Sequence, residues 1–405
     1  MRVQRTYDIV LFGATGFTGG LTAGYLARNA PDDCRWALAG RSLAKLERTR
    51  ERLAGADPRW AALPLLVADA GDPESLRRIA ADARVVATTV GPYTHHGEGL
   101  VAACAESGTD YVDLCGEPEF IDRMYLRHDA RARETGARLV HACGFDSVPH
   151  DLGARFTVEQ LPEGVPLRID GYVRTNATFS GGTLASVLTA LSRPLGMRRA
   201  ARERERREPW PGAAEGRTVR TGPAIPPGAR GLTVLPRRSR DAGAWAVPLP
   251  GADAQIVGRS AAALERYGPD FRYRHQAAVK RLPVAVGGMA TVGAVFALAQ
   301  VPYARRLLSA RLSPGEGPGA ERRARSRFSV RFFGEGGGRR VVTEVAGGDP
   351  GYDETAKMLA ESALCLAYDD LPKTAGQVTT AVAMGGPLTD RLTAAGLKFR
   401  VLSAS

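Results

Sequence analysis

Short apolar runs alternate with helix-like stretches through the first 150 residues. The apolar runs cover residues 7–12, 36–39, 63–68, 85–90, 111–114 and 138–143. Strands of a parallel sheet read as continuous apolar runs because helices cover both faces of the sheet. Helical spacing occupies residues 21–28, 99–107 and 119–135. Six predicted strands that alternate with helices are typical of a doubly wound α/β fold, so we expect a Rossmann-type domain over residues 1–150.

A glycine-rich turn follows the first apolar run directly. Gly13 would permit the tight turn, Gly16 would let the backbone approach a pyrophosphate, and Gly19 would let the next helix pack closely on the strand. The N-terminus of that helix would offer free N–H groups to the phosphates. We therefore predict a dinucleotide phosphate site formed by Gly13, Ala14, Thr15, Gly16, Phe17, Thr18 and Gly19.

The second predicted strand ends at Gly40 and is followed by Arg41 and Ser42. A site specific for NAD usually carries Asp or Glu here, where it binds the ribose 2′-hydroxyl. A guanidinium suits a 2′-phosphate instead, because it donates paired charge-assisted hydrogen bonds. The pattern favours NADPH as the cofactor; the alternative is that Arg41 only caps an exposed turn.

The ends of the third and fourth predicted strands supply the rest of the expected cofactor site. Ligands in open α/β sheets bind outside the carboxyl ends of the strands. Asp69 follows the third strand and is expected beside the adenine. The residues after the fourth strand are expected to line the nicotinamide half of the cofactor: Thr89, Val90, Gly91 and Pro92.

The composition changes after Gly153, which predicts a second, α+β domain over residues 151–350 built on a mixed or antiparallel sheet. Alternating apolar and polar positions predict strands at 167–175, 328–333 and 339–345. The last two would form a hairpin whose turn, Gly334 to Gly338, is longer than two residues. Residues 209–250 are rich in Pro, Gly and Arg and predict loops. Residues 351–405 would form a helical return, led by a helix at 352–366 that packs across the domain junction.

Residues 282–304 contain no charged side chain, and Arg281 and Arg305 flank them. The length approaches that of a membrane span, but Gly and Pro interrupt it and the flanking charges set no orientation. One interpretation is a buried helix or a pocket wall. The other is an apolar surface that contacts lipid or a long acyl chain, as a peripheral membrane contact.

Charge and cysteine content reduce the number of functions that the chain could have. The net charge is +12, and its densest run, Arg198 to Arg207, also carries Glu203 and Glu205, which is typical of a solvated helix face. No nucleic-acid-binding motif accompanies the charge, so we expect no nucleic-acid partner. Five dispersed cysteines favour neither a disulfide framework nor a zinc site. The start of the chain lacks the pattern of a secretory signal, so we expect a cytoplasmic protein, or one associated with a membrane through residues 282–304.

Taken in order, several stretches resemble the saccharopine dehydrogenase-like oxidoreductases, and most closely their trans-acting enoyl reductase branch. They are GATGFTG, GRS, TTVGPY, GTDYVDLCGE, ACGFDSVPHDLG, SPGEGP at 313–318, and YDETAKMLAESALCLA. The resemblance implies an NADP-binding domain followed by a second sheet domain. It also implies reduction of a carbon–carbon double bond on a hydrophobic acyl or polyketide-derived substrate that a separate synthase presents.

The sequence offers several candidates for the proton donor. Tyr93, His95 and His96 follow the fourth strand and are our catalytic candidates, since enoyl reduction needs a proton donor and a group that stabilises charge on the thioester oxygen. The alternative is that His95 and His96 are exposed loop residues. Asp146 and Ser147 would cap the next helix or reach the cleft, whereas His141 and His150 are expected to be structural. The segment Ser180 to Thr183 would form an anion site or a simple helix cap.

We expect no bound metal, because no His, Asp and Glu set has metal-ligand spacing in the sequence. The favoured function is an NADPH-dependent enoyl-type reductase. One alternative is a saccharopine-type oxidoreductase acting on a C–N bond, which would need basic clamps for the substrate carboxylates. The other is a non-catalytic NADP-binding protein associated with lipid or a membrane.

Overall fold

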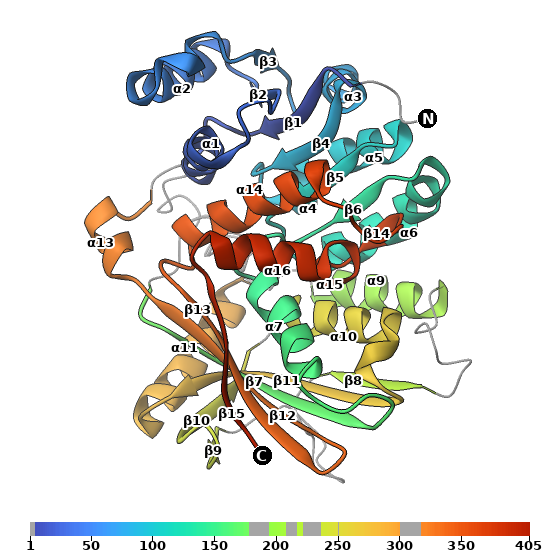
Figure 1. Ribbon diagram of the computed structural model, residues 1–405, viewed down its shortest axis with the longest axis vertical. Coiled ribbons are helices and arrows are strands. Elements are labelled where there is room, and N and C mark those ends of the chain that lie inside the picture. The colour runs from blue at the N-terminus through green and yellow to red at the C-terminus, as the bar shows by residue number, and fades with distance from the viewer. Residues whose placement is uncertain (1–4, 178–193, 208–216, 222–235, 250, 300–316) are drawn as a thin grey trace.

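The computed structural model describes residues 5–177, 194–207, 217–221, 236–249, 251–299 and 317–405. Two sheets follow one another along the long axis, with a layer of helices between them (Figure 1). The sheet that holds the N-terminal strands lies at the top of this view, and the second sheet lies at the bottom. The chain therefore has the predicted division into a nucleotide-type sheet and a second sheet.

The upper sheet is parallel throughout and has the order β14-β6-β5-β4-β1-β2-β3. Its strands are β1 (Tyr7–Phe12), β2 (Trp36–Gly40), β3 (Leu65–Val67), β4 (Ala83–Thr88), β5 (Asp110–Asp113), β6 (Arg138–Val140) and β14 (Gly376–Val378). Because β1 pairs with both β2 and β4, the strand order reverses beside it, which is where such sheets bind nucleotides. The predicted Rossmann-type fold is confirmed. The seventh strand, β14, comes from the C-terminal segment, where the structure has three helices and two strands in place of helices alone.

Both faces of this sheet are buried, which explains its continuous apolar runs. Along β1, Ile9 and Leu11 enter one hydrophobic core, while Val10 and Phe12 enter the other. The helices that follow the strands are α1 (Phe17–Asn29), α2 (Leu43–Ala56), α3 (Pro73–Asp82), α4 (Tyr93–His96), α5 (Glu98–Ser107) and α6 (Pro118–Thr135), with a 3₁₀ turn at Pro58–Ala62. They hold the sheet rigid, so that the loops at its carboxyl edge have a fixed base.

The second sheet has the order β15-β13-β12-β7-β11-β10-β9, and β8 also pairs with β11. Its strands are β7 (Leu167–Thr175), β8 (Thr218–Thr221), β9 (Arg237–Ser239), β10 (Ala244–Pro248), β11 (Asp270–Val279), β12 (Phe328–Gly336), β13 (Arg339–Gly347) and β15 (Lys398–Ala404). β7 and β8 run parallel to β11 and the other pairs are antiparallel, so the predicted mixed sheet is confirmed.

The β12–β13 hairpin is present, but its predicted turn length is wrong. Gly336 pairs with Arg339, which leaves a two-residue turn. Gly337 and Gly338 form this turn with φ of +57° and +80°, the left-handed conformation that two-residue hairpins favour. Gly334 and Gly336 stay in the strand ladder, since a glycine can pair like any other residue when its neighbours hold the register.

In the described part of the chain, the region between the sheets holds the helices α7 (Val148–Val158), α10 (Asp253–Ala263), α14 (Asp353–Tyr368), α15 (Thr380–Ala383) and α16 (Gly385–Ala394). In Figure 1 they lie between the sheets, with a 3₁₀ turn at Glu265–Tyr267 after α10. The buried carboxylate of Asp151 on α7 accepts hydrogen bonds from Ser260 on α10 (2.5 Å), and from Thr380 (2.7 Å) and the Ala381 amide (2.8 Å) on α15. These bonds connect three helices at one buried point, which favours a fixed junction.

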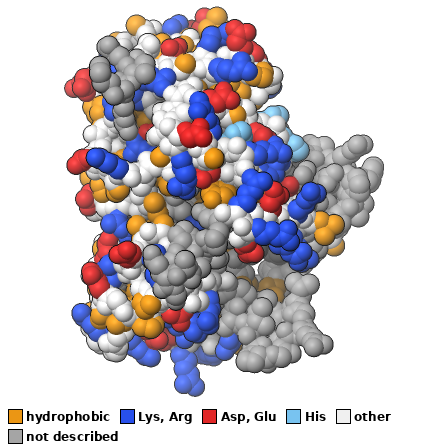
Figure 2. Space-filling view, turned by 90° about the vertical axis from the view of Figure 1, so that its right-hand side faces the viewer, with side chains coloured by type: hydrophobic (Ala, Val, Ile, Leu, Met, Phe, Trp, Pro, Cys, Tyr) orange, Lys and Arg blue, Asp and Glu red, His pale blue; other side chains and the backbone are white. Residues whose placement is uncertain are grey.

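The basic run lies on α9 (Pro194–Arg207), and it is only partly the solvated face that we predicted. Arg204 is buried, stacks over Tyr125 and pairs with Asp122 of α6 at 3.4 Å. Figure 2 shows basic side chains interspersed with acidic ones on the face it presents. The short α13 (Ala320–Arg325) carries further exposed arginines.

The apolar segment forms the helix α11 (Leu282–Ala299) beside β10 and β11. Its start is exposed, contrary to the buried-helix interpretation: the exposed fractions are 39% for Leu282, 60% for Val284 and 51% for Val286. Ala285 alone of residues 282–288 is buried. Within the described ranges, no helix combines the length and apolarity needed to cross a membrane.

Candidate active site

The glycine turn between β1 and α1 is packed tightly against the end of β4. Gly13 has φ of +90°, and a Cβ there would lie 2.7 Å from Cγ2 of Val90. A Cβ on Gly19 would lie 2.1 Å from the carbonyl oxygen of Gly13. The hydroxyl of Thr89 donates a hydrogen bond to that same oxygen at 3.2 Å. Only glycine fits at these two positions, as expected where a chain turns sharply under a dinucleotide.

The remaining residues of the turn divide between the surface and the core. Thr15 and Gly16 are exposed, and Ala14 is buried. Gly16 is the N-cap of α1 and has no side chain there, so the first N–H groups of the helix are open to an anion. Phe17 turns away, and its ring meets Tyr352 edge to face at 4.9 Å. The loop thus fits a pyrophosphate through its backbone.

Arg41 and Ser42 follow β2 on the same edge of the sheet. Arg41 is exposed. Ser42 is the N-cap residue of α2, yet its hydroxyl makes no capping hydrogen bond, so this donor is left for a ligand. Asp69, after β3, is exposed and accepts the Gly71 amide at 2.8 Å through Oδ1, which leaves its other oxygen open. Together these groups fit the adenosine half of NADP.

The three catalytic candidates after β4 lie in different environments. Tyr93 is buried; its hydroxyl donates to the carbonyl of Thr88 at 3.2 Å and accepts from the amide of Leu114 at 3.0 Å. Burial raises the pKa of Tyr93 well above its usual value. Tyr93 therefore connects the ends of β4 and β5. His95 and His96 lie exposed at the end of α4.

Glu117 holds the same two loops together. Its carboxylate accepts the amides of Tyr93 at 3.0 Å and Thr94 at 2.9 Å. The loop after β4, with the intermediate or exposed Thr89, Val90, Gly91 and Pro92, is thereby fixed to the start of α6. A fixed loop at this edge suits a ring that must be held in one orientation.

Asp146 brings the loop after β6 to the same edge. A Cβ on Gly116, in the loop after β5, would lie 2.8 Å from Oδ2 of Asp146. The side chain stays accessible to solvent, but the protein atoms around it displace much of the water and raise the pKa of the carboxyl. Ser147 is the N-cap of α7 but makes no side-chain capping bond, so the capping interpretation of this pair is wrong. Asp146 is instead exposed beside Gly116 in the loop after β5.

Sequence reasoning did not bring together His150, Asp253 and His275. They come from α7, α10 and β11, and the structure places a ligand atom of each within 4.8 Å of the others. His150 Nε2 lies 3.5 Å from Asp253 Oδ1, and His275 Nε2 lies 3.9 Å from Asp253 Oδ2. No spacing in the sequence signals this set, because its members lie on elements far apart in the chain.

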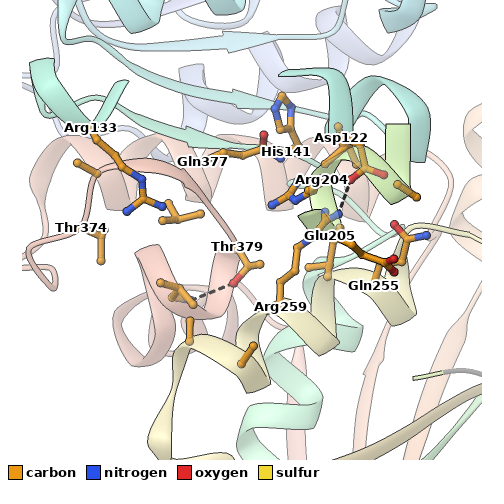
Figure 3. A pocket seen from close by; sticks show the side chains of 18 of the residues that line it. Asp122, Arg133, His141, Arg204, Glu205, Gln255, Arg259, Thr374, Gln377 and Thr379 are labelled. Carbon is orange, nitrogen blue, oxygen red and sulfur yellow. Dashed lines mark hydrogen bonds and ion pairs between the residues drawn. The ribbon is translucent and has the colours of Figure 1, made fainter. Parts of the chain in front are cut away.

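A cavity of about 620 Å³ opens beyond the ends of β6 and β14. His141 and Thr379, which follow those two strands, line it together with parts of α6, α9 and α10. Figure 3 shows Arg204 and Arg259 directed toward Asp122 on one side, and Arg133 on the other. The apolar part of the wall includes Ile121, Ala201, Ile256 and Val378. Apolar walls with a few convergent polar groups are typical of small-molecule sites.

His141 is held at the top of this cavity. Its Nδ1 lies 2.7 Å from Asp113 Oδ2, and its ring meets those of Tyr111 and Phe120 edge to face. The expected structural role fits these contacts. The predicted anion site at Ser180 to Thr183 and most of the SPGEGP stretch lie outside the described residues.

Comparisons with known proteins agree with this geometry. Residues 9–140 match the family model of the saccharopine dehydrogenase NADP-binding domain. A Mycobacterium tuberculosis protein is 40% identical over 98% of this chain and 97% of its own length. Proteins named trans-acting enoyl reductase from M. tuberculosis and Mycobacterium ulcerans are 38% and 35% identical, each over 97% of both chains.

The fold is also that of a solved structure, an apo saccharopine dehydrogenase (L-Glu forming) from Saccharomyces cerevisiae. The two match with a TM-score of 0.54 at 14% identity, over 98% of this chain and 100% of the other. At that identity the likeness concerns the fold alone. The full-length relatives and the NADP-binding domain decide the assignment: this chain belongs to the saccharopine dehydrogenase-like family of NADP-dependent oxidoreductases, in its trans-acting enoyl reductase branch.

Proposed function

We propose that this protein uses NADPH to reduce a carbon–carbon double bond of an acyl or polyketide-derived thioester that a separate synthase presents. The observation that carries the proposal is the edge formed by the glycine turn, Arg41 and Ser42. The full-length relatives that bear the name trans-acting enoyl reductase support the choice of reaction.

Different residues of this edge bind different parts of the cofactor. The backbone of Gly13 to Gly19 holds the pyrophosphate, Arg41 and Ser42 hold the 2′-phosphate, and Asp69 lies beside the adenosine. Thr89, Val90, Gly91 and Pro92 hold the nicotinamide half. NADPH, when bound, supplies the hydride for the β carbon of the alkene. The protein must then supply a proton to the α carbon and stabilise charge on the thioester oxygen.

We propose Asp146 as the proton donor, in addition to the earlier candidates. Its carboxyl is accessible beside the β5 loop, and its raised pKa keeps it protonated closer to neutral pH. His95 and His96 remain proposed donors to the thioester oxygen, because they are exposed after β4. Tyr93 suits a positioning role more than proton donation, because the two hydrogen bonds of its hydroxyl connect the loops after β4 and β5.

The cavity beyond β6 and β14 favours a thioester over an amino-acid substrate. Arg204 and Arg259 both pair there with Asp122, and Arg133 pairs with Asp129 at 2.7 Å. Saccharopine-type chemistry requires basic groups that clamp substrate carboxylates, whereas each of these three guanidinium groups already pairs with a carboxylate of the protein. The apolar wall of Ile121, Ile256 and Val378 suits an acyl chain.

The test follows NADPH consumption by the purified protein with two substrate types. One is an enoyl thioester, both free and on the carrier domain of a synthase; the other is a 2-oxo acid with an amine. We expect one NADPH consumed for each double bond saturated, faster from the carrier. Consumption only with the oxo acid and amine would favour the C–N alternative, and binding without turnover on any substrate would favour the non-catalytic one.

We also propose that the exposed start of α11 contacts lipid or the hydrophobic substrate chain. Leu282, Val284 and Val286 are exposed apolar side chains in the first five residues of α11, and Lys280 and Arg281 precede them in the chain. Exposed apolar side chains bordered by basic ones suit the interface of an anionic membrane. Flotation of the protein with anionic liposomes tests the contact, and recovery only in the soluble fraction would exclude stable binding.

A further inference from the structure

His150, Asp253 and His275 form a compact set of potential metal ligands behind Asp146. The two imidazole rings meet edge to face with centroids 4.5 Å apart, and Asp253 lies against the Nε2 atoms of both. Both histidines are buried, and Asp253 is nearly so. The ligand atoms come from three elements, α7, α10 and β11, so a bound ion would join the helix that leaves the upper sheet to the centre of the lower one.

Asp253 faces both imidazole rings. In the part of the chain that the structure describes, the ion-pair partners of Asp253 are these two histidines alone. A carboxylate that faces two imidazole nitrogens places three potential ligand atoms around one point.

Among the residues that the structure describes, two buried polar atoms of the set have no hydrogen-bond partner: Oδ1 of Asp253 and Nδ1 of His150. Buried polar atoms are almost always paired, so an orphaned oxygen beside two imidazoles indicates a missing ligand. The hydroxyl of Tyr273 lies 3.2 Å from Nδ1 of His275. This contact can hold the proton on Nδ1, which leaves the Nε2 lone pair free to coordinate.

We propose that His150, Asp253 and His275 bind one divalent transition-metal ion of the zinc type. Two imidazole nitrogens and one carboxylate oxygen are a common donor set for Zn²⁺ and for Co²⁺, its spectroscopic substitute, and they leave one coordination position open. Mg²⁺ and Ca²⁺ prefer sets made of oxygen atoms and would bind weakly here. A second pair of neighbouring histidines, His95 and His96, is exposed on the surface of α4.

The test is metal binding by the full-length chain after treatment with a chelator. Titration calorimetry with ZnCl₂ would give the stoichiometry and affinity, and the visible absorption of added Co²⁺ would report coordination. We expect about one Zn²⁺ per chain, with affinity reduced roughly 100-fold or more in Asp253→Asn and His275→Gln. The double variant His95→Ala/His96→Ala is the matched control and should bind like the unmodified protein.

Circular dichroism of the metal-free variants separates loss of the site from loss of the fold. If Asp253→Asn does not fold, His150→Gln replaces it in the titration. Absence of stoichiometric Zn²⁺ binding by the unmodified chain would overturn the proposal, as would unchanged affinity in the folded variants of the three ligands. Loss of Zn²⁺ only in the His95→Ala/His96→Ala variant would place the ion on the surface of α4 and overturn it equally. None of these outcomes depends on the NADPH assay, so the enoyl reductase proposal is tested separately.

Discussion

The cofactor edge and the junction behind it differ in how they are encoded. The edge consists of consecutive residues at the ends of β1, β2 and β4, each fixed by its own turn: Gly13 by its positive φ, Gly19 by its contact with the Gly13 carbonyl. The junction takes its groups from α7, α10, β11 and β14, which meet only when both sheets have formed. A local motif can be recognised in the sequence, whereas a site assembled by tertiary packing cannot.

The two regions also differ in what their polar groups do. At the cofactor edge, Arg41 and the hydroxyl of Ser42 face outward, available to a ligand. At the junction, Asp151 is fully engaged by Ser260, Thr380 and Ala381. The edge is therefore organised for binding, and changes there should alter affinity before they alter stability. Changes at the junction should alter both.

The largest expected effect is at the edge itself. Gly19→Ala would place a methyl group 2.1 Å from the Gly13 carbonyl oxygen, so we expect the turn to distort and NADPH binding to fall at least roughly 100-fold. Fluorescence titration measures the binding. Gly55→Ala is the matched control: its Cβ on α2 meets nothing within 4 Å, and the variant should bind normally. Normal binding by Gly19→Ala would remove the turn from the cofactor site.

Asp146→Asn should come next, because a positioned proton donor contributes on the order of 100-fold or more to turnover. We expect kcat to fall with NADPH affinity unchanged, and the fall to exceed that of His95→Ala or His96→Ala. Steady-state kinetics across a pH series makes the comparison. A kcat for Asp146→Asn equal to that of the unmodified enzyme would exclude Asp146 as the donor.

A smaller effect is expected on α11, away from both sites. The double variant Val284→Asp/Val286→Asp adds two charges to exposed apolar positions, which should weaken liposome binding several-fold through lost apolar contact and repulsion by anionic lipid. Flotation measures the bound fraction, and NADPH affinity serves as the control. Equal flotation of both proteins would show that this surface is not the contact.

The smallest effect should come from the second sheet. Burial works to raise the pKa of Glu344, but hydrogen bonds from Arg331 and Arg400 outweigh it and lower the pKa. A lowered folded-state pKa gives stability that is present above the unfolded value of about 4.5 and is lost as pH falls through the folded value. Glu344→Gln should lower the free energy of unfolding by about 1 kcal/mol at pH 7. The expected loss is small because both arginine side chains are partly exposed and solvent screens their charges. Urea unfolding at pH 7 and below pH 4 should show the difference shrinking in acid; a difference that grows in acid would contradict the assignment.

Most of the fold and the cofactor edge could be predicted from the sequence because their signals are local. Apolar runs predicted β1 and β4, alternating apolar and polar positions predicted β7, and the glycine spacing predicted the turn before α1. The strand β14 was missed because three residues, Gly376–Val378, carry too little pattern to stand out. The β12–β13 turn was placed too early because the run of glycines does not reveal which of them stay paired.

The junction could not be predicted, for a physical reason. His150 looks like an isolated core histidine until β11 brings His275 beside it and α10 brings Asp253. Likewise, the apolar content of α11 indicates a preference for apolar surroundings, but not whether the protein supplies them. The exposure of Val284 and Val286 decides that point, and only the packed structure gives it.

The most direct test of the central claim, that this edge selects NADPH through Arg41, is a paired titration. NADPH and NADH are titrated against the unmodified protein and against Arg41→Ala, with Ser42→Ala as a second variant. The account predicts that NADPH binds tighter by roughly 10- to 100-fold, that Arg41→Ala removes most of this preference, and that NADH affinity stays unchanged. Equal affinity for the two nucleotides in the unmodified protein, or an undiminished preference in Arg41→Ala, would contradict it.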